Sequence, residues 1–139
     1  MNNAQQLAIK FLHRAERTSL ELRNFLASKG VAESEIVTVL EWAIAKTYVD
    51  DSRVAEREIE IAKSKSIGPE KLRMKLEKRG LVEYFDKVEL GDDLANAKQL
   101  IKKKKITDKS KAARVLNSQG YSEEIIHEVI ESWEIDFES

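Results

Sequence analysis

The chain has 139 residues, with 24 basic and 25 acidic side chains and a formal net charge of −1 at neutral pH. This length suits one ordinary domain or a short array of small repeats. Because the charges nearly cancel, the bulk charge argues against a protein that coats nucleic acid without specificity. The sequence contains no cysteine, which excludes disulfide bonds, thiolate metal sites and cysteine nucleophiles.

The remaining composition narrows the class of protein further. Only 5 glycines and 1 proline occur, and 42% of the residues are hydrophobic. These values disfavour β-sandwiches, collagen-like chains and a wholly disordered chain. The first residues lack the basic and apolar regions of a signal peptide, and no apolar run approaches the roughly 20 residues that cross a bilayer. We therefore expect a soluble protein of the cytoplasm that has no contact with a membrane.

Taken in chain order, the predicted elements are helices separated by glycines. Apolar residues recur at intervals of three and four, as Leu22 and Leu26 do before Gly30. This spacing places apolar side chains on one face of a helix, and no useful stretch alternates with the period of two that strands require. The chain is predicted to be all-helical.

Three of the glycines align three copies of one pattern. Twelve residues before each stands a plausible helix start, and the intervening segments 19–29, 69–79 and 109–119 are each about three turns long. The starts are Thr18, Gly68 and Asp108, and the glycines are Gly30, Gly80 and Gly120. Another helix is predicted before each segment, over Leu7–Ala15, Val54–Ala62 and Leu94–Ile101. A third follows each glycine, carrying Ile36 to Ala43, then Phe85, Val88 and Leu90, then Ile125 to Trp133.

The pattern therefore predicts tandem three-helix repeats, about nine helices in all. The first repeat would cover residues 1–49, the second 50–91 and the third 92–139, with no independent linker between them. Units this small are marginally stable alone and usually stack on their neighbours. We expect the stack to be an elongated, curved body.

Few residues could carry out chemistry. Asp50-Asp51 and Asp92-Asp93 are paired carboxylates that could bind a metal or act as acid and base, but each pair directly precedes a predicted helix. Capping of a helix N-terminus explains both pairs better. The two histidines, His13 and His127, lie far apart in sequence and have no evident partners. The sequence thus predicts no enzyme, no metal site and no cofactor.

The distribution of charge is more informative than its sum. Residues 63–80 hold seven basic and two acidic side chains, and residues 98–114 hold eight basic side chains against Asp108 alone. Residues 121–139 contain seven acidic side chains and no basic one. Two interpretations remain open: the basic runs are solvated helix faces, or they form a surface for a polyanion or an acidic protein groove. Aromatic residues are sparse in these runs, so stacking on bases is weakly supported.

Three blocks of the sequence together resemble the RecX family of bacterial recombinase regulators. They are Leu12–Gly30, Tyr48–Ala55 and Gly68–Gly80. In the first block the residues that match the family's spacing are Arg14, Glu16, Thr18, Glu21, Leu22, Leu26 and Gly30. The second, YVDDSRVA, is similar to the family's tyrosine, paired aspartate and arginine signature. The third begins with the family's Gly-Pro and continues with leucines at helical spacing.

The resemblance implies a function that composition cannot give. RecX-like proteins are not enzymes; they bind the helical filament of RecA on single-stranded DNA and lie in its groove. There they lower its ATPase, strand-exchange and coprotease activities, which modulates recombinational repair and the SOS response. By this resemblance we expect a monomer whose partner is the RecA filament and whose contact with DNA is weak or indirect.

Contact residues can be nominated from the basic positions in the matching blocks. The candidates are Arg53, Arg57, Lys71, Arg73, Lys75, Lys78 and Arg79, with Arg14 and Arg23 as secondary candidates. The signature residues expected to be structural are Tyr48, Asp50, Asp51, Gly68 and Pro69. Two alternatives stay open: a helical module that binds DNA directly, with a steep dependence on salt, and a helical scaffold for another protein.

Overall fold

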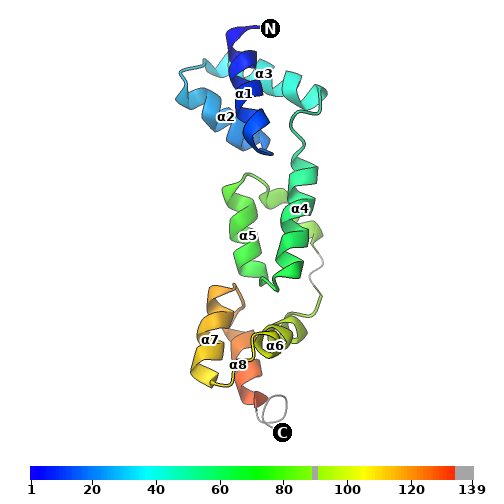
Figure 1. Ribbon diagram of the computed structural model, residues 1–139, viewed down its shortest axis with the longest axis vertical. Coiled ribbons are helices and arrows are strands. Elements are labelled where there is room, and N and C mark those ends of the chain that lie inside the picture. Colours follow the sequence, from blue (N-terminus) through cyan, green and yellow to red (C-terminus); the bar gives the residue numbers. More distant parts are fainter. Residues whose placement is uncertain (89–90, 134–139) are drawn as a thin grey trace. The chain divides into compact units, whose positions relative to one another are not determined.

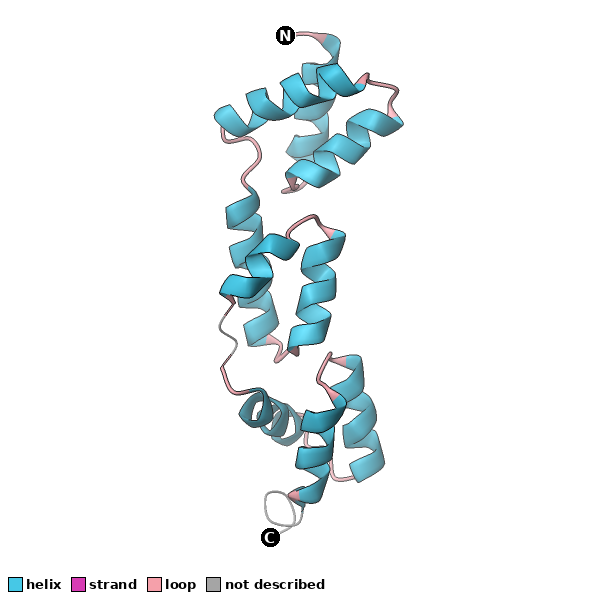
Figure 2. Ribbon diagram, turned by 180° about the vertical axis from the view of Figure 1, so that it is seen from behind, coloured by secondary structure: helices cyan, strands magenta, loops and turns pink. Residues whose placement is uncertain are grey.

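The computed structural model describes residues 1–88 and 91–133, and within them it contains helices and connecting loops without a strand (Figures 1 and 2). Eight α-helices and one 3₁₀-helix, η1, lie in this part of the chain. Their bounds are α1 Asn3–Arg14, α2 Ser19–Ser28, α3 Glu33–Ala45, α4 Asp51–Ser64, α5 Pro69–Lys78, η1 Val82–Lys87, α6 Asp93–Lys103, α7 Lys109–Ser118 and α8 Glu123–Glu131. The predicted all-helical class and the count of about nine helices are confirmed.

Several helices, among them α1, α2 and α7, are preceded by a residue whose side chain accepts a hydrogen bond from a free backbone N–H group. Thr18 accepts a hydrogen bond from the N–H of Glu21, and the Glu21 carboxylate accepts one from the N–H of Thr18. This is the capping box that the sequence predicted. Asn2 and Gln5 form a second capping box before α1, so α1 begins four residues earlier than its apolar pattern indicated. Asp108 caps α7 by accepting from the N–H of Ser110.

The third element of the middle triplet differs from the prediction. A short α-helix was expected there, whereas residues Val82–Lys87 form a 3₁₀-helix. Six residues allow few i→i+4 hydrogen bonds, and the 3₁₀ form is commonly used in such short pieces. Leu90, which was assigned to this helix, lies outside the described residues.

The chain divides into two compact units. The first consists of Met1–Arg57 with Leu76–Tyr84, and the second of Glu58–Lys75 with Phe85–Ser139. The division crosses α4 and α5, so the middle triplet supplies helical segments to both units. The predicted repeat boundaries at 49/50 and 91/92, and the stacking into an elongated, curved body, stay predictions.

Each compact unit has its own apolar core. In the first unit, α1, α2 and α3 surround a cluster of buried side chains: Ala4, Ala8, Leu22, Leu26, Ile36, Val39, Ala43 and Val49. In the second unit, α6, α7 and α8 surround Ala97, Leu100, Ile101, Ile106, Ala112, Leu116, Tyr121, Val129 and Trp133. These residues include most of the periodic apolar positions, which are removed from water as the sequence pattern predicted.

Two backbone segments of the second unit lie unusually close together. The N–H of Gly68 donates to the carbonyl of Gln119 at 2.7 Å, and the N–H of Glu70 donates to that of Gly120 at 3.2 Å. A Cβ atom at Gly68 would lie 2.5 Å from the carbonyl oxygen of Gly120, and one at Gly120 would lie 2.4 Å from Cβ of Lys71. Only glycine allows this approach between the start of α5 and the turn that ends α7.

Tyr121 reinforces the same contact from the core side. Its hydroxyl donates to the carbonyl of Ser66 at 2.8 Å. Burial, together with the nearby Asp93 carboxylate, raises the pKa of Tyr121 to about 12. The phenol therefore keeps the proton that this hydrogen bond needs.

We predict that Gly120→Ala destabilises the chain more than Gly30→Ala. Both glycines follow the second helix of a triplet and have left-handed backbones, with φ of +91° and +82°, so alanine costs about 1–2 kcal/mol at either. Only Gly120 faces the backbone of Lys71, whereas no atom lies within 4 Å of a Cβ at Gly30. Overpacking should add about 1–3 kcal/mol at Gly120. Urea unfolding of the two variants measures the difference, and equal losses would contradict the close approach.

Candidate functional site

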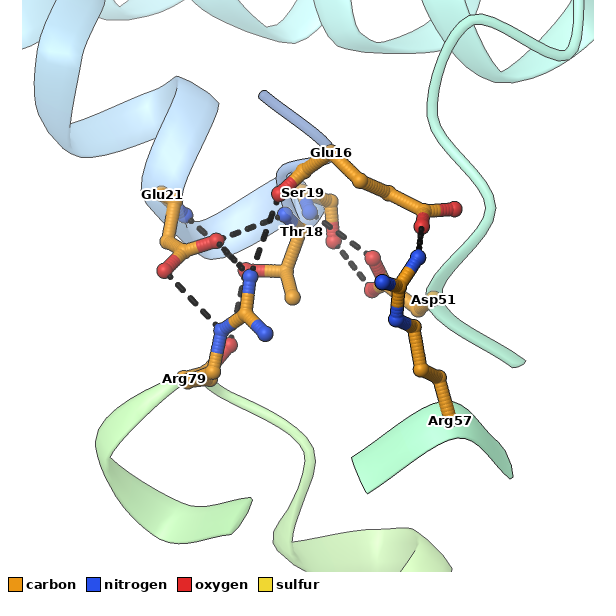
Figure 3. A network of polar contacts seen from close by, with 7 residues as sticks. All are labelled: Glu16, Thr18, Ser19, Glu21, Asp51, Arg57 and Arg79. Atoms are coloured by element: carbon orange, nitrogen blue, oxygen red, sulfur yellow. Dashed lines mark hydrogen bonds and ion pairs between the residues drawn. The ribbon is translucent and has the colours of Figure 1, made fainter. Parts of the chain in front are cut away.

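A network of polar contacts in the first compact unit joins the start of α2 to the turn that ends α5 (Figure 3). Thr18 is fully buried, and its hydroxyl donates to the carbonyl of Arg79 at 2.7 Å. The guanidinium of Arg79 donates to the Glu21 carboxylate from Nη2 at 3.0 Å and from Nε at 3.2 Å. It also donates to the carbonyl of Glu16. Such a two-point contact between a guanidinium and a carboxylate fixes both the distance and the orientation.

The protonation of Glu21 is coupled to this contact. Burial would raise the pKa of Glu21, but hydrogen bonds from Arg79 and from the backbone of Thr18 outweigh it, so the pKa is lowered from its ordinary value of 4.5. The side chains of Glu21 and Arg79 are each 25% exposed, so solvent screens the pair only in part. The ionised form of Glu21 is the one that holds the turn.

A second part of the network involves α4. The Asp51 carboxylate accepts hydrogen bonds from the backbone N–H of Ser19 at 2.8 Å and from its hydroxyl at 2.5 Å. Nε of Arg53 lies 2.6 Å from the Glu16 carboxylate, and Nη1 of Arg57 lies 3.8 Å from it. The contacts between Asp51 and Ser19 attach the first residue of α4 to the first residue of α2.

We expect Glu21→Gln to lower the free energy of unfolding by about 1–3 kcal/mol at pH 7, because a hydrogen-bonded ion pair is replaced by a neutral contact. A group with a lowered folded-state pKa stabilises the fold above its unfolded pKa, and this contribution disappears as the pH falls through the folded value. The gap between wild type and variant should therefore shrink from about pH 4.5 downwards. Thermal unfolding from pH 7 to pH 3 measures it, and a constant gap would argue against the linkage.

The second compact unit carries an equivalent pair with different chemistry. Glu21 and Lys71 each stand nine residues before a repeat glycine, and Arg79 and Gln119 each stand directly before one. The ammonium of Lys71 donates to the amide oxygen of Gln119 at 2.7 Å. The same position of the fold is thus occupied by an ion pair in one unit and by a hydrogen bond between lysine and glutamine in the other.

The first aspartate of each pair serves as a helix cap. Asp50 accepts a hydrogen bond from the N–H of Arg53, and Asp92 accepts from those of Leu94 and Ala95. Burial and the neighbouring Asp92 carboxylate raise the pKa of Asp93. Within residues 1–88 and 91–133, no group of three or more histidine or acidic side chains is placed to hold a metal ion.

The structure separates the nine predicted contact residues into two groups. Five have partners within the chain: Arg23 with Glu33, Arg53 and Arg57 with Glu16, Lys71 with Gln119, and Arg79 with Glu21. Four make no ion pair or hydrogen bond through their side chains to the described residues: Arg14, Arg73, Lys75 and Lys78. The charges of the second group are thus not engaged by the part of the chain that the structure describes.

Of the signature residues, Tyr48 is the most exposed. Its ring packs edge-on against Trp42 with centroids 5.4 Å apart, yet 46% of the residue remains accessible. Tyr48 also lines a shallow hollow of about 310 Å³ with Ile9, Leu12 and His13. Gly68 and Pro69 lie at the close approach that begins α5.

Sequence reasoning did not nominate one basic group that the second unit assembles. Lys103 and Lys104, at the end of α6, line a hollow of about 410 Å³ together with Lys65, which follows α4. The run Lys102–Lys105 was visible as charge in the sequence. Its proximity to Lys65 depends on how the helix ends pack, which no local pattern reveals.

Comparison with known proteins places the chain in a family. A model of the first three-helix domain of RecX matches residues 4–42. The regulatory protein RecX of Staphylococcus carnosus is 34% identical over 95% of this chain and 54% of its own length. The RecX of Geobacillus thermodenitrificans is 30% identical over 91% of this chain and 52% of its own length. The chain belongs to the RecX family.

Further relatives agree with this assignment. The RecX of Vibrio parahaemolyticus is 26% identical over 86% of this chain and 84% of its own length. The chain therefore spans about half the length of the Staphylococcus and Geobacillus relatives and most of the Vibrio relative. The crystal structure of RecX from Lactobacillus salivarius matches with a TM-score of 0.69 at 21% identity, covering 95% of each chain. At that identity the match concerns the fold, and it agrees with the all-helical architecture.

These relatives are named as regulatory proteins. Among the residues that the structure describes, no helix combines the length and the apolar character that crossing a membrane requires.

Proposed function

We propose that this protein binds the RecA filament on single-stranded DNA in the cytoplasm and lowers its ATPase, strand-exchange and coprotease activities. The observation that carries the proposal is the similarity to regulatory proteins RecX, which extends over 95% of this chain. By this proposal the chain acts through binding and carries out no reaction of its own.

The proposed contact surface centres on α5. Arg73 and Lys78 are exposed, Lys75 is half-buried, and Met74 between them is 69% exposed. A surface with an accessible apolar side chain among unpaired cations can combine buried area with charge complementarity to an acidic groove. We therefore assign the filament contact first to Arg73, Lys75 and Lys78, with Arg14 as a further candidate. Arg53, Arg57 and Arg79 are assigned a structural role, because each already contacts a glutamate of the first unit.

We predict that the purified chain inhibits the ATPase of RecA on single-stranded DNA at substoichiometric amounts. Arg73→Glu with Lys75→Glu should weaken this inhibition at least tenfold, because two attractive contacts to an acidic surface become repulsive. The measurement is a titration of RecA ATPase with wild type and variant, with circular dichroism to confirm that each is folded.

The matched control is Lys109→Glu with Lys111→Glu. Both lysines are exposed in the first turn of α7, so the control has the same change in net charge and lies in the same compact unit. It should retain inhibition within about threefold. Equal losses in the two variants would mean that only total charge matters, and a folded wild type without inhibition at equimolar protein would reject the proposed function.

A further inference from the structure

Helix α3 of the first compact unit exposes apolar side chains beside its buried face. Eight of its 13 residues are apolar, at positions 36, 37, 39, 40 and 42–45. Ile36, Val39 and Ala43 are buried in the core, whereas Val37 is 46% exposed and Ile44 is 53% exposed. These last two residues are seven positions apart and share one face of the helix. A helix that is apolar around most of its circumference is normally covered by other elements, and this exposed face of α3 has no such cover.

A hollow continues the exposed face beyond the end of α3. Ile44 and Tyr84, both in the first compact unit, line this hollow of about 350 Å³. Asp50 and Asp51 also line it, and their carboxylates form no ion pair with a described residue. The N-terminus of α4 offsets about half of one negative charge, which leaves the hollow acidic. Capping accounts for the place of these carboxylates, but it leaves the apolar side chains beside them uncovered.

The charge around the exposed face selects the kind of occupant. α3 carries Glu33, Glu35 and Glu41 and no basic residue. Among the described residues, only Glu33 has a basic partner, which is Arg23. A second α3 would therefore be repelled by like charge. A surface that presents an apolar side chain among cations matches both the apolar face and its acidic surroundings.

The chain itself carries such a surface on α5. Met74 is 69% exposed and stands between Arg73 and Lys75, which form no ion pair with a described residue. α5 has four basic and two acidic residues, so its net charge is opposite to that of α3. The two helices have 10 and 13 residues, which allows one to lie along the other for about two to three turns.

We propose that the exposed face of α3, with its acidic hollow, binds α5 of a second copy of this chain. Each copy offers one α3 face and one α5 surface, so the contact is heterologous and leaves one surface free at each end of an assembly. Few side chains take part, compared with the roughly 20 to 30 residues that each partner contributes to a standard interface. The association is therefore weak and reversible. At high protein concentration it replaces the monomer that the family resemblance led us to expect.

The test is sedimentation velocity of the full chain alone, from about 10 to about 500 μM, where small contacts become occupied. The weight-average mass of wild type should rise above the 15.9 kDa of one chain. V37Q with I44Q removes the exposed apolar side chains of α3, and R73E with K75E reverses two charges on α5. Each pair of changes should weaken self-association at least tenfold, and circular dichroism confirms that each variant is folded. Wild type that stays at the mass of one chain would overturn the proposal.

An equimolar mixture of the two variants tests the pairing of α3 with α5 directly. The intact α5 of V37Q/I44Q can bind the intact α3 face of R73E/K75E, whereas every other pairing is impaired. The mixture should therefore form a complex that stops at two chains. Absence of this complex would contradict the proposal. Self-association that persists in R73E/K75E alone would also contradict it, because α3 would then pair with another surface.

Matched controls change exposed residues elsewhere in the same compact units. N24Q with A27Q lies on α2 of the first unit, and K109E with K111E lies on α7 of the second. Both should self-associate within about threefold of wild type. Losses as large as those of the test variants would show that the association does not depend on the proposed faces.

The RecA ATPase titration distinguishes failure of this inference from failure of the proposed function. V37Q with I44Q keeps α5 intact, so it should inhibit RecA at least as well as wild type, since self-association competes for α5. Loss of inhibition in this variant would assign the α3 face to the filament and overturn the second copy as its occupant. Wild type that self-associates without inhibiting RecA would reject the proposed function and leave this inference standing.

Discussion

The close approach of a glycine turn to the start of a neighbouring helix is the constraint on which much of this structure depends. In the second compact unit, Gly68 and Gly120 let two backbones hydrogen-bond directly, with no room for a Cβ atom on either. In the first unit, Gly80 lies against the side chain of Leu20, and a Cβ there would come within 2.6 Å of it. Helices so short gain little stability alone, so these contacts between triplets, together with the two apolar cores, hold them in place.

The side chains at the two contacts show how one geometry accepts different chemistry. Glu21 and Arg79 form a two-point ion pair, whereas Lys71 and Gln119, at equivalent positions, form a hydrogen bond. The ion pair uses a cation that sequence alone would assign to a partner. Basic residues of this protein therefore fall into those that hold the triplets together and those that remain available, such as Arg73 and Lys75.

The chain has a net charge of −1, yet its charged side chains are unevenly distributed along the sequence. The division of the basic residues into paired and unpaired ones shows which of these charges have a partner within the chain. Arg73 and Lys75 on α5, and Lys103 and Lys104 at the end of α6, form no ion pair with a described residue. The filament contact proposed for α5 needs an acidic protein groove that accepts charge and an exposed methionine. The RecX relatives, two of them about twice as long as the aligned region, offer a natural comparison.

The sequence by itself determined the all-helical class, the place of most helices and the resemblance to the family, because apolar spacing, capping residues and glycine turns act over a few neighbouring residues. It also predicted correctly that Asp50 and Asp92 cap helices, since a cap and its N–H partners lie within three residues. It did not determine that Arg79 pairs with Glu21, or that Lys65 meets Lys103 and Lys104. Only the tertiary structure decided these, because such contacts join residues about 40 to 60 positions apart, and their geometry is set by how whole helices pack.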